Sequence, residues 1–160
     1  MVDGYVVFGK KNTDSDKDYK VIDIITDFNT STYTHKGLKK GTVYNYIVQA
    51  YTIEAGNMML LCSSKPVIAV TLGGKYGNVN ILKVNKKSVK LKKGKSITLK
   101  VTTKYKGGKK ILRKTAFESS NTKIAVVNKK GKITAKKRGK CYIYVYAQNG
   151  IFKKIKITIK

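Results

Sequence analysis

Residues 141–159 read CYIYVYAQNGIFKKIKITI, a stretch that holds two strand patterns around a turn signal. Before the turn, small or aliphatic residues alternate with Tyr142, Tyr144 and Tyr146, which places the two sets on opposite faces of a strand. Asn149-Gly150 is a strong signal for a tight hairpin. The second strand then carries the apolar residues Phe152, Ile155, Ile157 and Ile159. The stretch predicts an antiparallel hairpin with one face in a core.

The same period of two continues outward along the chain. Val43–Tyr51 is the strongest strand pattern of the first half, and Ile97, Leu99 and Val101 share one face in the second. β-Branched and aromatic residues dominate these runs, and Gly, Asn and Asp separate them. No window of about 12 residues holds a helical apolar stripe. The chain is therefore predicted to be all-β, with two antiparallel β-sandwich modules in tandem.

Charge divides the chain into two parts. The net charge is +27; residues 1–76 carry nine Lys and seven acidic residues, whereas residues 77–160 carry 26 basic residues and the single acid Glu118. Three glycines within residues 73–77 interrupt any strand pattern. We expect a first module over 1–72, a Gly-rich linker over 73–78 and a second module over 79–160.

Residues 3–72 resemble a fibronectin type III module, and the resemblance is carried by Leu38 to Tyr51. This stretch places Leu38 six residues before Tyr44, the position of the family's corner tyrosine, whose hydroxyl bonds back to the backbone. Ser31-Thr32-Tyr33-Thr34 resembles the family's fifth strand. The family's first two strands have no counterpart in the sequence, so a sheet edge is expected to be exposed. This favours either a smaller sheet or a strand-exchanged homodimer.

Residues 79–160 resemble a bacterial immunoglobulin-like domain of group 2. The matching segments are 91–99, 117–121, 124–128, 131–135 and 137–140. Phe117 stands where the family usually has Trp, which changes core volume and leaves the fold intact. Both resemblances imply spacer or adhesion modules of bacterial surface or secreted proteins, in an extracellular, cell-surface or cell-wall location, and neither implies catalysis.

Patterns for catalysis and metal binding are weak. Asp14, Asp16 and Asp18 alternate as in a calcium loop, but the sixth and twelfth positions hold Tyr19 and Ile25, which favours a solvated hairpin loop. His35 is the only histidine, so no histidine pair or triad exists. We expect no enzymatic activity, no metal, no cofactor and no small-molecule substrate.

The cysteines and the apolar runs suggest neither a disulfide framework nor a membrane span. Cys62 and Cys141 lie in different halves, and Cys141 is in phase with buried residues. No run approaches the ~20 apolar residues of a transmembrane helix. The chain lacks a signal-peptide pattern and a wall-sorting tail, which indicates a piece of a longer protein.

Lysine pairs and tyrosines are the clearest functional hints. Pairs at 86–87, 92–93, 109–110, 129–130 and 136–137 lie mostly in predicted turns. Lys129, Lys130, Lys136, Lys137 and Arg138 are the candidate anion-binding residues, and Tyr142, Tyr144 and Tyr146 are the candidate stacking residues. For the lysines, a solvated basic surface is the favoured interpretation over a dedicated site for an anionic polymer. We expect a structural or adhesion module that contacts anionic cell-wall polymer; the alternatives are a glycan- or nucleic-acid-binding module and an ancillary domain of a secreted hydrolase.

Overall fold

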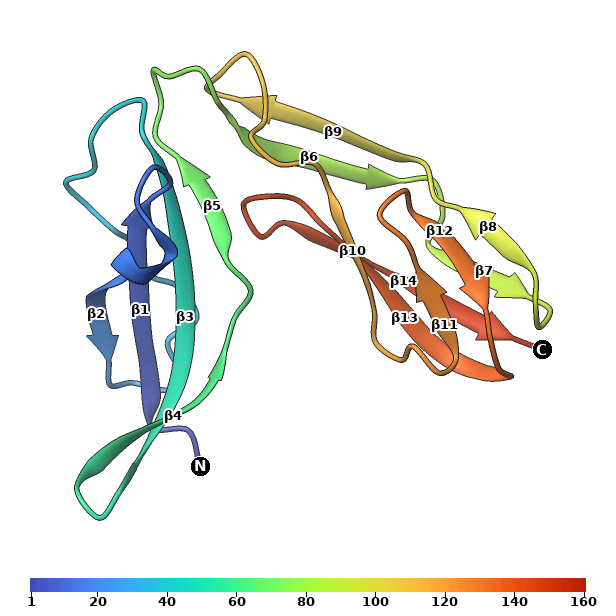
Figure 1. Cartoon of the computed structure of the whole chain (residues 1–160), viewed down its shortest axis with the longest axis horizontal. Coiled ribbons are helices and arrows are strands. Elements are labelled where there is room, and N and C mark those ends of the chain that lie inside the picture. Colours follow the sequence, from blue (N-terminus) through green and yellow to red (C-terminus); the bar gives the residue numbers. More distant parts are fainter. The chain divides into compact units, whose positions relative to one another are not determined.

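The computed structural model describes all residues, 1–160, and divides into two compact units, Met1–Tyr76 and Gly77–Lys160. Every regular element is a β-strand except one short 3-10 turn, η1 (Asp16–Asp18), as Figure 1 shows. The predicted fold class, all-β with two sandwich-like modules, is therefore confirmed. The strands are β1 (Gly4–Lys11), β2 (Lys20–Ile25), β3 (Val43–Glu54), β4 (Asn57–Ser63), β5 (Val67–Val70), β6 (Asn78–Val84), β7 (Ser88–Leu91), β8 (Ser96–Thr98), β9 (Val101–Lys106), β10 (Ala116–Ser119), β11 (Ala125–Val127), β12 (Lys132–Ala135), β13 (Gly139–Tyr146) and β14 (Phe152–Ile159).

The first unit is built on one antiparallel sheet with the strand order β2-β1-β3-β4. β3 is long enough to pair with β5 along Val43–Tyr46 and with β4 along Gln49–Glu54. Residues 31–34, expected as a strand, form none. They belong to the connection between β2 and β3, and Tyr33 and Leu38 of that connection line a hollow with Val48. No neighbouring strand offers them a hydrogen-bonding partner, so their strand propensity is not realised.

The second unit packs three sheets around one core. The sheets have the orders β10-β13-β14-β7, β11-β12-β8 and β6-β9, and β7 joins β14 in parallel. The predicted hairpin over residues 141–159 is confirmed by the antiparallel register of β13 and β14, which pairs Tyr144 with Lys154. Ile143, Ile155 and Ile157 are almost fully buried, and each contributes roughly 1.5–3 kcal/mol of hydrophobic stabilisation.

Phe117, on β10, packs against the turn that joins β11 to β12. Gly131 closes this turn at a φ of 77°, with its N–H donated to the Asn128 carbonyl at 2.9 Å. A Cβ at Gly131 would lie 2.9 Å from the Phe117 ring. The aromatic position therefore depends on a glycine in the facing turn for space as well as for backbone conformation.

This packing can be separated from the backbone effect by two glycine substitutions. Gly131→Ala and Gly94→Ala both place alanine at a positive φ, 77° and 79°, but a Cβ at Gly94 meets nothing within 4 Å. We expect both to destabilise the protein, by about 1 kcal/mol for Gly94→Ala and by about 1–3 kcal/mol more for Gly131→Ala, where the ring must shift. Urea unfolding of the two variants measures the difference. Equal losses would show that Phe117 tolerates the added methyl group.

Candidate functional site

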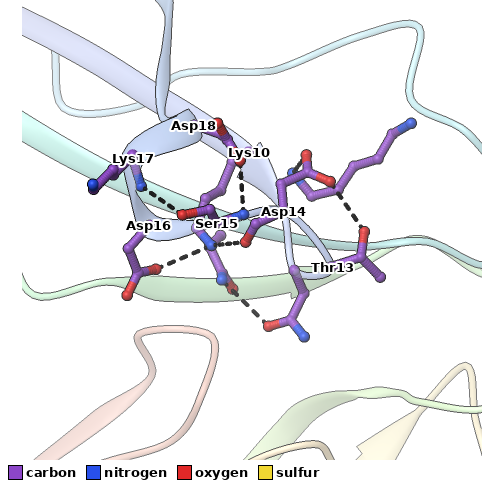
Figure 2. A network of polar contacts seen from close by, with 10 residues as sticks. Lys10, Thr13, Asp14, Ser15, Asp16, Lys17 and Asp18 are labelled. Carbon is purple, nitrogen blue, oxygen red and sulfur yellow. Dashed lines mark hydrogen bonds and ion pairs between the residues drawn. The ribbon is translucent and has the colours of Figure 1, made fainter.

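The aspartate-rich hairpin loop of the first unit is organised around a buried lysine (Figure 2). Lys10 is 7% exposed; its Nζ donates to the Asp14 carbonyl at 2.7 Å and forms an ion pair with Asp16 Oδ1 at 3.1 Å. The Tyr19 ring centroid lies 5.4 Å from the same Nζ. Because a buried ammonium group needs a partner, the loop is shaped to hold this cation.

The aspartate carboxylates of that loop bond to nearby protein donors. Asp14 accepts the Lys11 N–H at 3.2 Å and the Thr13 hydroxyl at 3.1 Å. Asp18 accepts the Ser15 N–H at 2.7 Å and so caps η1. No group of three metal-ligating side chains converges anywhere in the described chain. The hairpin is a locally satisfied polar loop.

The predicted structural residues of the first unit lie together. Tyr44 is 8% exposed and its hydroxyl accepts the Lys39 N–H at 3.0 Å. Leu38 lines an open hollow with Val48 and Val67, and His35 Nδ1 lies 2.9 Å from the Tyr46 hydroxyl at the edge of this hollow. Burial, followed by the proximity of Tyr44 and Tyr33, raises the pKa of Tyr46 to about 12.

The raised pKa of Tyr46 predicts a specific alkaline instability. A free tyrosine ionises near 10.0, so the folded state holds this proton more tightly than the unfolded state. The stabilising contribution is present below pH 10 and is lost as the pH rises towards 12. We expect a tyrosinate absorbance titration to show a phenol with a pKa of about 12 that is missing in Tyr46→Phe. Burial also raises the pKa of Tyr19, Tyr33 and Tyr146, so a high-pH component of undiminished amplitude in that variant would refute the assignment.

The predicted anion-binding residues separate into two places in the second unit. Lys129 and Lys130 lie in the turn before β12, and Lys136–Arg138 lie in the loop after it, so a full strand stands between them. The second group lies beside another basic loop, because Gly94 N–H donates to the Ala135 carbonyl at 2.9 Å and Ala135 N–H donates to the Lys95 carbonyl at 2.9 Å. The five predicted residues therefore lie in two loops, one at each end of β12.

The predicted stacking residues form a row on the outer face of β13. The rings of Tyr144 and Tyr146 stack at 5.9 Å, and Phe152 of β14 extends the row with centroids 6.1 and 5.9 Å from them. Lys154 Nζ lies 3.9 Å from the Tyr142 ring centroid and therefore covers part of it. Phe152, 53% exposed, was not predicted to belong to this row. The sequence does contain a signal for this position: in a strand, Phe152 falls on the opposite face from Ile155, Ile157 and Ile159.

A groove in the second unit was also missed by sequence reasoning. It has a volume of about 480 Å³ and is lined by β6, by the turn that follows β6 and by β14. Its lining includes the lysines Lys83, Lys86, Lys87, Lys153 and Lys154. The two groups of lysines are far apart in the sequence. Only the adjacent pairs 86–87 and 153–154 can be recognised in it, and nothing local links one pair to the other.

The two cysteines have different surroundings and are both free. Cys141 is buried, and burial raises the pKa of its thiol; Cys62 is exposed on β4. The structure also contains no helix that is long and apolar enough to cross a membrane.

Comparison with known proteins identifies one family. The family model of the bacterial Ig-like domain (group 2) matches residues 78–158, which lie in the second unit. No curated protein sequence matches the chain.

Solved structures that match the chain include S-layer proteins. The S-layer protein rSbsC(31-844) is 17% identical with a TM-score of 0.46, and the match covers 74% of this chain and 16% of that one. Domains 4 and 5 of the S-layer protein SbsC are 18% identical with a TM-score of 0.46, covering 72% of this chain and 64% of that one. The chain thus spans less than two thirds of the length of either of these proteins.

Proposed function

The chain belongs to the bacterial Ig-like domain (group 2) family, and on this premise we propose that it is a non-catalytic structural module of a bacterial surface or secreted protein. A tightly packed second unit supports this proposal. Ile133, Ile143 and Ile157 have no exposed surface, and a close-packed interior of this kind resists deformation. Such a module suits a spacer that holds other domains away from the cell wall.

We further propose that the second unit contacts anionic cell-wall polymer. It carries 26 basic residues and a single acidic residue, Glu118. Glu118 lies on β10 opposite Tyr144 of β13. A surface with so little neutralisation carries a positive potential of several kT and concentrates polyanions near it. The charge of this unit is the observation that carries the proposal.

The proposed contact predicts salt-sensitive binding without selection among polyanions. The full chain is titrated with a teichoic acid, with duplex DNA and with a neutral glycan, each at low and high salt. We expect both polyanions to bind at low salt and to lose about 10³-fold or more in affinity at high salt, because counterion release drives the binding. The neutral glycan should not bind. Salt-resistant binding to one ligand would contradict a spacer with electrostatic contacts.

The aromatic row supports a second candidate function, the recognition of a glycan. Tyr144, Tyr146 and Phe152 form a continuous aromatic surface, and such surfaces stack against flat ligand faces. In the same titrations this function would appear as salt-resistant binding to the neutral glycan that is lost in Tyr144→Ala. Nucleic-acid stacking would appear in the same way with single-stranded DNA. A role as an ancillary domain of a secreted hydrolase concerns a larger protein and is compatible with either surface.

We also propose that two copies of the chain associate through β4. This edge strand exposes Met58, Met59, Leu60 and Leu61, each 43–52% exposed. Antiparallel pairing of two β4 strands would set Met59 opposite Leu60 and bring Lys65 of each copy to the hairpin tip of the other, where Glu54 lies. The nearly neutral first unit lets copies approach there, and an unpaired apolar edge favours such pairing.

Sedimentation velocity tests this association with two matched substitutions. Leu60→Lys places a charge on the β4 edge, whereas Leu72→Lys places one at a more exposed apolar site, 66% against 52%, outside any strand. We expect a dimer for the unmodified chain and for Leu72→Lys, and a monomer for Leu60→Lys, because a lysine on an edge strand opposes pairing. A monomeric unmodified chain, or equal behaviour of the two variants, would refute the β4 interface.

A further inference from the structure

The lysine-lined groove lies where two strands of the second unit separate. The second half of β14 pairs with β7, from Lys156 opposite Ser88 to Ile159 opposite Leu91. The first half of β14 does not pair with β7. β6 lies on that side of it and pairs with β9 instead. The groove occupies the space between β6 and the first half of β14. It is therefore a consequence of the strand topology, and the turn after β6 completes its lining.

The lining of the groove combines positive charge with an apolar surface. Lys83, Lys86 and Lys87 come from the side of β6, and Lys153 and Lys154 from the side of β14. Ile81, Val84 and Ile151 supply apolar surface between them, and no acidic side chain lines the groove. Five like charges around a concave surface of low dielectric focus the field, so an anion is attracted more strongly here than on an open face.

One of these lysines connects the groove to the aromatic row. Lys154 Nζ lies 3.9 Å from the Tyr142 ring centroid and 5.9 Å from that of Tyr144. Cation–π contacts of this kind hold an ammonium group in place without neutralising it. Lys154 thus lines the groove with part of its side chain, while its ammonium group lies over the rings of β13.

We propose that this groove is the seat of the anionic polymer, and that the polymer is a single flexible chain of phosphates joined by short polyol units. The inference rests on the proposed function and deepens it. Phosphates pair with Lys83, Lys86 and Lys153, while the carbon backbone lies on the apolar floor. A volume of about 480 Å³ is that of a site for a small ligand or a short segment of one chain. The rigid cylinder of a duplex does not enter a groove of this size, so duplex DNA would bind only the open basic surface of the unit.

Two variants with equal charge test the groove against the rest of the basic surface. The groove variant carries Lys83→Gln, Lys86→Gln and Lys153→Gln; the control variant carries Lys129→Gln, Lys130→Gln and Lys136→Gln. All six lysines are exposed, and each variant loses three charges from a net charge of +27. The probe is poly(glycerol phosphate), titrated into the full-length chain over a range of salt concentrations. Thermal melts establish that both variants fold.

If the groove is the binding site, the two variants should lose unequal amounts of affinity for poly(glycerol phosphate). We expect the groove variant to bind at least about tenfold more weakly, with a slope of log K against log salt reduced by about two, as for lost phosphate contacts. The control variant should lose less than about threefold in affinity, as for the removal of remote charges. Amide resonances of Ile81 and Ile151 should shift on titration.

The two ways of failing are distinguishable. Equal losses in both variants, or shifts confined to residues 129–138, would refute the groove and leave the electrostatic function standing. An unmodified chain that does not bind poly(glycerol phosphate) would refute the proposed contact with polymer and the groove together. Retention of binding by the groove variant and its loss by the control variant would place the site at the predicted loops instead.

Discussion

The pairing of β13 with β14 is the interaction on which the second unit depends. Its register aligns Ile143 with Ile155 and Cys141 with Ile157, so a single sheet face supplies the centre of the core. β10 and β7 add to the two outer edges of this pair. A slip of one residue would turn the tyrosines and lysines inward and the isoleucines outward. The free-energy cost of that exchange holds the register.

The same register creates the two candidate functional surfaces. When one face is committed to the core, the other must carry Tyr142, Tyr144, Tyr146 and Lys154 towards solvent. The parallel addition of β7 to only part of β14 then leaves the space that β6 and its lysines border. The groove and the aromatic row are thus two results of one pairing, and Lys154 belongs to both.

The first unit has the same period of two in its strands but is built on a single sheet. Its long strand β3 pairs with β1 on one edge and with β4 and β5 on the other, and it buries Tyr44 and Tyr51. One sheet leaves apolar side chains uncovered, as the exposed strand β4 shows. Its charge is almost balanced, whereas that of the second unit is not. Close contact between copies is therefore electrostatically easier through the first unit.

Alternation of residue types is a local property, and it alone determined the all-β class, the hairpin of residues 141–159 and the inward phase of Cys141. The fibronectin type III resemblance predicted a strand at residues 31–34, and none forms there, because a strand needs a hydrogen-bonding partner that a local match cannot supply. The grouping of lysines was decided by tertiary structure. Lys129–Lys130 and Lys136–Arg138, near in sequence, lie at opposite ends of β12, while Lys83 and Lys153 border one groove. Long-range strand order brings such residues together, and no local pattern encodes that order.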